Sequence, residues 1–250
     1  MNLEFANMDS LSLEIMWDWY QHPPGSLILS WENKEATRFL EMIRGKYLIQ
    51  MGGERTLAHS AGSPILYHIQ LTSDLTNNLL SIQMDSQELP LLSNSVDVFV
   101  LVHVLEFINY PVKLIQEIFR VLKPEGRLFI FGFNPWSLWG LKKLFFIKHG
   151  VPWNGKFWAC AQVKHWLINF QYSISFSKTF GYGFLTENSL NQRLQFIKEM
   201  IGKVCFPTAG SIYLVVAKKK VYAPVYRKIL WKKKSVIAQS VIKPTPSLKL

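Results

Sequence analysis

The fold is decided by the stretch Ile82–Gly140, which reads IQMDSQELPLLSNSVDVFVLVHVLEFINYPVKLIQEIFRVLKPEGRLFIFGFNPWSLWG. Within it, Val96–Val102 is an apolar run of β-branched and aromatic residues, of strand length and interrupted only by Asp97. Strands that are apolar on both faces are typical of parallel sheets covered by helices on both sides. This run therefore predicts a central strand of a buried sheet.

The residues after this run change to a helical period. From Pro111 the apolar side chains fall on one face, made of Leu114, Ile115, Ile118, Val121 and Leu122. Proline is favoured in the first turn of a helix, and the sequence KPEG at 123–126 predicts a sharp stop. Arg127–Phe131 is then a second buried strand. The whole segment predicts a β-α-β unit with a right-handed crossover.

These segments together point to a known family. MDSQELPL, SVDVFVLVHVLEF, the proline-started helix and RVLKPEGRLFIFGFNP resemble the second half of a class I S-adenosylmethionine (SAM)-dependent methyltransferase domain, of the ubiquinone- and biotin-pathway type. The likeness is strong over residues 80–135 and weaker over 45–80, and GFNPWSLWG is similar to a bacterial subgroup. The resemblance implies an α/β fold with a doubly wound, mostly parallel, Rossmann-like sheet of seven strands that binds SAM at the carboxyl ends of its strands.

The rest of the chain is predicted to surround this unit in three parts. Residues 1–45 form an N-terminal helical segment, in which Ser30 is expected to cap a helix. Residues 46–220 form the methyltransferase-like domain, with the aromatic stretch 134–157 as an insertion after the fifth strand. Residues 221–250 contain scattered lysines and prolines and are expected to be a flexible tail.

The hydrophobic pattern predicts further elements. Strands are expected at Lys46–Met51, Pro64–Leu71, Leu79–Met84, Tyr172–Phe180 and Ser211–Ala217. Helices are expected at Ala159–Phe170 and Glu187–Ile201.

Composition points to a cytoplasmic globular protein. The chain has 250 residues, 49% of them hydrophobic, which is enough for one α/β core. Cys160 and Cys205 form no CxxC pair, and two free, mostly buried thiols are the ordinary state in a reducing cytosol. The N-terminus lacks the basic start of a signal peptide, and no uninterrupted apolar run reaches the ~18 residues of a membrane-spanning helix.

The net charge of +11 is concentrated at the C-terminus. Ten of the 28 basic residues lie in 218–250, which leaves 18 basic against 17 acidic residues in the rest of the chain. The tail mixes cations with Tyr, Ile and Trp, so it is suited to an anionic membrane surface or to RNA phosphates, or is simply a solvated tail. The nearly neutral body offers no extended basic groove of the kind that an RNA methyltransferase needs.

The resemblance places the methionine part of SAM at the turn LIQMGGERT, after the first strand. Family members have an acid there, followed by a G-x-G-x-G turn, because glycine lets the backbone approach the ligand closely. In this chain Gln50 replaces the acid, Gly52 occupies a family position with Gly53 beside it, and Glu54 and Thr56 replace the other glycines. The alternative is a plain tight turn between a strand and a helix.

The next two strands of the family end in acids that bind the nucleoside part of SAM. For the ribose hydroxyls the equivalent is Gln70 or Asp74, and the sequence does not decide between them. Asp85 matches the acid that accepts a hydrogen bond from the adenine amino group. Its alternative role is to cap its own loop by bonding to the backbone.

The fourth strand ends at Val102 and His103, which match family positions lining the adenine and methyl-transfer region. His103 lies close to Glu106, but no third ligand accompanies them, so a metal site is not expected. A histidine packed at the strand end is the simplest interpretation, and a catalytic general base is the alternative.

The aromatic segment after the fifth strand would border the acceptor. Asn134 is a candidate to orient it, and Phe133, Trp136 and Trp139 either wall a small lipophilic or planar acceptor or cap the core. The predicted function is methyl transfer from SAM to such an acceptor. The alternative is a methyltransferase fold that has lost catalysis and acts as a binding or membrane-surface adaptor.

Overall fold

A computed structural model of the chain describes residues 16, 18–53, 62–72, 81–83, 88–145, 152–182 and 208–220. Its strands are β1 (Tyr47–Gly52), β2 (Tyr67–Thr72), β3 (Ser81–Gln83), β4 (Val96–Val102), β5 (Leu122–Phe133), β6 (Tyr172–Phe180) and β7 (Ile212–Lys219). Its helices include α2 (Gly25–Leu40), α3 (Pro111–Val121), α4 (Leu138–Phe145) and α5 (Cys160–Asn169).

The strands form one seven-stranded sheet in the order β3-β2-β1-β4-β5-β7-β6. Neighbours from β3 to β5 are parallel, and β7 is antiparallel to both β5 and β6. Because β7 alone is reversed, the carboxyl ends of the other six strands lie at one edge of the sheet. The predicted doubly wound, mostly parallel, Rossmann-like sheet is therefore confirmed.

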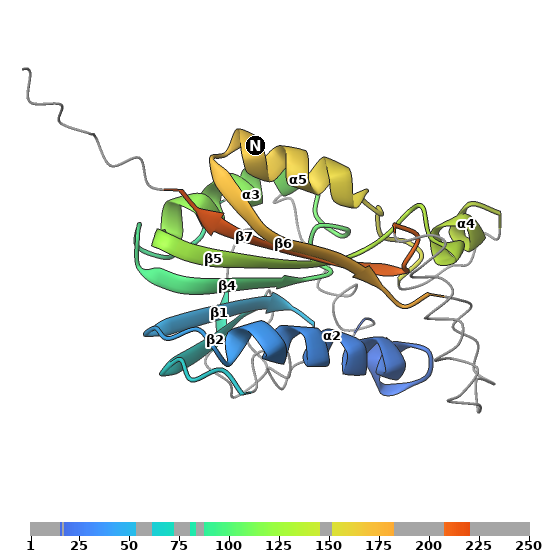
Figure 1. Cartoon of the computed structure of the whole chain (residues 1–250), viewed down its shortest axis with the longest axis horizontal. Coiled ribbons are helices and arrows are strands. Elements are labelled where there is room, and N and C mark those ends of the chain that lie inside the picture. Colours follow the sequence, from blue (N-terminus) through green and yellow to red (C-terminus); the bar gives the residue numbers. More distant parts are fainter. Residues whose placement is uncertain are drawn as a thin grey trace, which may run out of the picture.

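Helices cover both faces of the sheet, as expected for strands without a polar face. Figure 1 shows α3 and α5 on one side of the strands and α2 on the other. Ile115 and Leu167 belong to the buried cluster on the α3–α5 side, and Ile28 and Leu40 belong to the cluster on the α2 side. Each such side chain contributes roughly 1.5–3 kcal/mol by leaving water.

Most predicted elements occur at the expected places. The predicted strands 96–102 and 172–180 coincide with β4 and β6, and the helix predicted at 159–170 is α5 with one residue fewer at each end. The helix predicted at 187–201 and the basic tail lie outside the described residues. The domain boundaries stay a prediction, although α2 packs into the core together with the sheet.

One local prediction is wrong and another is confirmed. Ser30 does not cap a helix, because α2 begins at Gly25 and Ser30 lies in its second turn, where its hydroxyl donates to the Leu27 carbonyl at 2.7 Å. The earlier start is favoured because it buries Ile28 completely. The sharp stop predicted at KPEG is confirmed: α3 ends at Val121, and KPEG belongs to an irregular first part of β5 with a register shift.

Asp97, the polar interruption of β4, has a structural role. Its Oδ2 accepts hydrogen bonds from the backbone N–H groups of Lys46 and Tyr47 at 2.9 and 3.0 Å, and Lys123 Nζ donates to its carboxylate at 2.7 Å. Burial alone would raise the pKa of Asp97, but Lys123 and the two N–H groups outweigh it and lower the pKa below 3.8. The carboxylate therefore fixes the start of β1 beside β4.

We expect Asp97→Ala to lower the free energy of unfolding by about 2 kcal/mol, because two backbone donors and an ammonium lose a charged acceptor. The carboxylate has a lowered pKa in the folded chain, so its contribution is present above about pH 3.8 and is lost as the pH falls further. Urea denaturation at pH 7 measures the change.

The matched control is Glu125→Gln, because the Glu125 side chain is 59% exposed and pairs with Lys218 at the surface. Such pairs contribute roughly 0–1 kcal/mol. Equal losses of stability for the two variants would contradict the structural role of Asp97.

No helix among the described residues has the length and apolar character needed to cross a membrane.

Candidate functional site

The ends of β1, β4 and β5 lie next to one another at the carboxyl edge of the sheet. Gly52 is in register with Val102, and Val102 is in register with Phe131. Any ligand bound at this edge therefore meets the residues that directly follow these three strands.

The glycine turn after β1 has a conformation that glycine alone accepts easily. Gly52 and Gly53 have φ angles of +74° and +76°. A Cβ atom on Gly52 would lie 2.3 Å from the Val102 carbonyl oxygen and 2.6 Å from Val104 Cγ2. The close approach of β1 to β4 thus requires Gly52.

The side chain of Gln50, two residues before Gly52, is hydrogen-bonded to the backbone of this turn. Its side chain is fully buried, and its Nε2 donates a hydrogen bond to the Gly52 carbonyl oxygen at 3.2 Å. A carboxylate has no hydrogen to donate, so an acid at this position could not make the same contact. The replacement of the expected acid therefore changes how the turn is held.

A buried ion triad lies directly beyond β4. His103 Nε2 is 2.6 Å from Glu32 Oε1, and His103 Nδ1 is 3.1 Å from Glu106 Oε1. All three residues are at most 3% exposed. Burial alone would lower the pKa of His103, but the two carboxylates outweigh it and raise the pKa to about 9. Both ring nitrogens therefore carry protons at neutral pH.

The triad connects elements that are distant in the sequence. The Tyr20 hydroxyl donates to Glu32 Oε2 at 3.1 Å, and the Phe133 N–H donates to Glu106 Oε1 at 2.8 Å. The His103 ring also stacks on Phe133 with a centroid distance of 3.8 Å. Helix α2, the end of β4 and the end of β5 are therefore held together by one network.

This geometry narrows the predicted roles of His103. An imidazolium with both N–H groups bound to carboxylates has no lone pair with which to accept a proton from a substrate. The two nitrogens face different carboxylates, and no group of three potential metal ligands occurs among the described residues. His103 is therefore buried at the strand end with a carboxylate on each ring nitrogen, and its role toward a ligand stays a prediction.

No local pattern indicated that His103 pairs with Glu32, which is 71 residues away. Its position on α2 was visible only as an acidic residue in a predicted helix. A signal for the pair would have been the buried face of α2, on which Glu32 falls with Ile28, Ala36 and Leu40. A carboxylate on an apolar helical face needs a buried partner.

Asn134 shapes the turn after β5. It is 2% exposed, and its Nδ2 donates to the carbonyl oxygens of Thr208 and Gly210 at 2.7 and 2.9 Å. Its Oδ1 accepts a hydrogen bond from the Trp136 N–H at 3.1 Å. The amide thus joins the end of β5 to the chain before β7.

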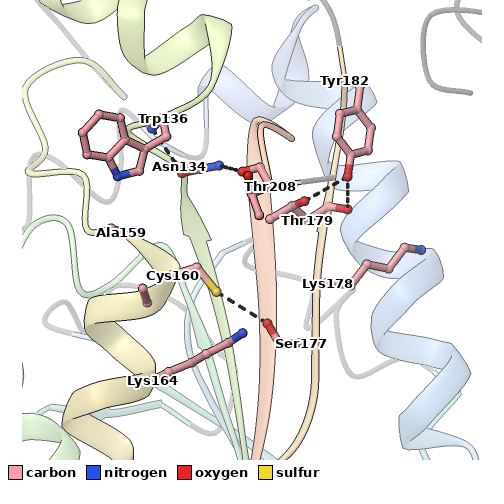
Figure 2. Close-up of a pocket in the computed structure, with 11 residues that line it drawn as sticks. Asn134, Trp136, Ala159, Cys160, Lys164, Ser177, Lys178, Thr179, Tyr182 and Thr208 are labelled. Carbon is pink, nitrogen blue, oxygen red and sulfur yellow. Dashed lines mark hydrogen bonds between the residues drawn. The ribbon is translucent and has the colours of Figure 1, made fainter. Parts of the chain in front are cut away.

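The neighbouring tryptophans differ in their environment. Trp139 is 3% exposed and packs among the rings of Trp19, Phe133 and Trp153, so it caps the core as expected. Trp136 is 75% exposed, so for this residue the core-capping interpretation is wrong. Its ring lines a cavity, whose lining residues are drawn in Figure 2.

This cavity has a volume of about 540 Å³ and lies between the first turn of α5 and strand β6. Its lining comprises Asn134, Trp136, Ala159, Cys160, Ala161, Lys164, Ser177, Lys178, Thr179, Tyr182 and Thr208. The free thiol of Cys160 is half-buried there, 3.5 Å from the Ser177 hydroxyl. The sequence did not predict this cavity.

The remaining predicted cofactor residues are placed only in part. Asp74 and Asp85 lie outside the described residues, as do Glu54, Thr56 and Cys205. Gln70 is buried within β2, in register with Gln50 of β1.

Comparisons with known proteins agree with the fold. Residues 65–130 match the family model described as "Methyltransferase domain". The structure resembles a SAM-dependent methyltransferase from Thermotoga maritima with a TM-score of 0.61 and 13% identity, over 87% of this chain and all of the other.

Residues 65–130 therefore match a methyltransferase domain, and the chain has the fold of solved SAM-dependent methyltransferases. SAM is the cofactor of this class.

Two further proteins are similar to it. The uncharacterised protein YafS of Escherichia coli K12 is 25% identical over 203 residues, which cover 81% of this chain and 80% of YafS. The [4+2]-cyclase SpnF has the same fold, with a TM-score of 0.57 and 14% identity over 87% of this chain and 95% of its own. The methyltransferase fold therefore also occurs in a protein named for a different reaction.

We expect His103→Gln to lower the free energy of unfolding by about 3–5 kcal/mol, because two buried carboxylates lose their counter-charge. The pKa of His103 is higher in the folded chain than the ordinary value of 6.5, so its stabilisation is complete below pH 6.5 and is lost as the pH rises through about 9. Urea denaturation at pH 6 and pH 9 measures both effects.

His165→Gln is the matched control, because His165 is exposed on α5. The control should keep the stability of the wild type within about 0.5 kcal/mol. If the His103 variant kept the pH dependence of the wild type between pH 6.5 and 9, the charged triad would be refuted.

Proposed function

We propose that the protein is a cytoplasmic SAM-dependent methyltransferase that acts on a small lipophilic or planar acceptor. The observation that supports it most is the glycine turn at the carboxyl end of β1, with Gly52 and Gly53 both at positive φ. The family binds SAM at this turn. An arrangement that requires glycine here, next to the fourth strand, fits the methionine part of the cofactor.

The residues proposed to hold SAM surround this turn. Gly52 and Gly53 would offer their backbone to the methionine part, and Val102 and His103 would line the region beyond β4. Asp85 would accept a hydrogen bond from the adenine amino group. SAM supplies an electrophilic methyl group, and the chain positions the acceptor in line with it, an effect worth roughly 7–11 kcal/mol in well-oriented reactions.

His103 would act on this reaction through position and charge. Its imidazolium is bound to Glu32 and Glu106, so the proton lost by an acceptor must leave to solvent or to another group. The proposal therefore favours acceptors that are adequate nucleophiles without a strong base.

The first test is titration calorimetry of the purified chain with SAM and S-adenosylhomocysteine. We expect micromolar affinity, about −8 kcal/mol. Asp85→Ala and Gly53→Ala should each weaken the binding about tenfold, which is about 1.4 kcal/mol, through a lost adenine contact and through a methyl group at the cofactor turn.

Gly62→Ala is the matched control for the glycine variant. Gly62 also has a positive φ, +84°, but a Cβ there meets nothing closer than 3.5 Å, beside Thr37. Gly52 is less useful, because its Cβ would collide with β4 and disturb the strand itself. Absence of binding by the folded wild type at a millimolar dose would overturn the enzyme function.

A second function, the non-catalytic adaptor, is favoured by one observation. Gln50 uses its amide to brace the glycine turn where the family has an acid, so the turn is held by the chain's own contact. In this alternative the basic tail would bind an anionic membrane surface or RNA. Binding to phosphatidylserine vesicles that disappears on removal of residues 221–250, in a chain that binds no SAM, would support the adaptor.

A further inference from the structure

The cavity between α5 and β6 lies on the same edge of the sheet as the proposed cofactor turn. Phe133 at the end of β5 is in register with Ile212 of β7, which is in register with Phe180 at the end of β6. Asn134, the residue after β5, forms part of the cavity wall. A volume of about 540 Å³ is within the roughly 300–1,000 Å³ of small-molecule sites.

The charged residues among the described lining residues are all positive. The described lining residues include two lysines and no carboxylate. Lys178 forms an ion pair with Glu35 of α2. Lys164 makes no ion pair with any described carboxylate. It therefore remains available as a cation for a ligand.

The position of Lys164 directs its charge into the cavity. Lys164 follows Cys160 by four residues, so the two side chains lie on the same face of α5. Figure 2 shows the Lys164 ammonium group directed toward Cys160 and Ser177. Ser177 presents a hydroxyl group on the opposite wall, from strand β6.

The start of α5 adds to the positive potential. The helix begins at Cys160 without a side-chain cap at Ala159 and without an acidic residue in its first turn. The first N–H groups of a helix have no partner within it and carry the positive end of its dipole. Residues 159–161 line the cavity, so this end of the helix borders the same space as Lys164.

The cavity lining includes an exposed aromatic residue. Trp136 is 75% exposed there, although the surrounding Trp139 and Phe133 are buried. Figure 2 shows its indole on the side of the cavity where α5 begins, next to Ala159. An exposed indole presents a flat apolar face on which a planar molecule can stack.

We infer that this cavity binds a planar or apolar small molecule that carries a carboxylate or phosphate group. Lys164 and the first turn of α5 hold the anion, and Trp136 contacts the planar body. That this molecule is the methyl acceptor rests on the proposed function.

The test is titration calorimetry with naphthalene-2-carboxylate and with naphthalene-2-carboxamide, which has nearly the same shape but no charge. We expect the carboxylate to bind at least about tenfold more tightly. Titration with 2-naphthyl phosphate then shows which of the two anionic groups the cavity prefers.

Two variants separate the charge from the fold. Lys164→Gln should weaken binding of the carboxylate about tenfold and leave the carboxamide unchanged. Ala161→Glu places a negative charge in the exposed first turn of α5, where it favours the helix, and should abolish binding of the carboxylate. Lys34→Gln removes an exposed lysine from α2 and is the control with unchanged affinity.

Equal affinity for the carboxylate and the carboxamide, or wild-type affinity in Lys164→Gln, would overturn the assignment. SAM is titrated into the same samples. If the chain binds the carboxylate but not SAM, the cavity assignment stands and the proposed function is overturned. If the chain binds SAM but neither naphthalene anion, the proposed function stands and the cavity assignment is overturned.

Discussion

The arrangement of the carboxyl edge depends on the buried ion triad of Glu32, His103 and Glu106. Removing such charges from water costs several kcal/mol for each ion, and the cost is offset only when every partner is in place. His103 also has a φ of +53°, a conformation that histidine adopts more readily than most residues. Helix α2 and the ends of β4 and β5 must therefore take their positions together.

A fourth charge links the triad to the segment after β5. Burial lowers the pKa of Lys143 of α4, and the nearby Glu106 acts in the opposite direction. Lys143 Nζ donates to the Gly155 carbonyl and lies 4.1 Å from the centre of the Phe157 ring. The negative charges of the two carboxylates are thus balanced by the positive charges of one imidazolium and one ammonium group. The aromatic insertion is in this way tied to the charged network at the strand ends.

Sequence reasoning succeeded where local pattern decides structure. The apolar run 96–102 and the alternating pattern over 172–180 form β4 and β6. In both segments the order of apolar and polar side chains within the segment itself was enough to predict a strand. It failed where a contact joins distant segments: Asp97 looked like an interruption of a strand, although it fixes the start of β1. Glu32 likewise meets His103 only when the sheet is assembled. The same holds for Lys164, which lies opposite Ser177 in the cavity. No local spacing in the sequence predicts either contact.

The departures from the family pattern do not by themselves decide the reaction. Gln50 replaces an acid but donates to Gly52, and the turn has Gly52 and Gly53 at positive φ with this support. The likeness to SpnF shows that this fold also occurs in a protein named as a cyclase, so the fold leaves the chemistry open. The feature that could distinguish an enzyme from an adaptor is the cavity between α5 and β6, at the carboxyl edge of the sheet. Of the two lysines that line the cavity beside the end of β5, Lys178 pairs with Glu35 of α2, and Lys164 pairs with no described carboxylate. Binding of the proposed anion to Lys164 would make this cavity part of a working site, whereas an inert scaffold has no need of such binding.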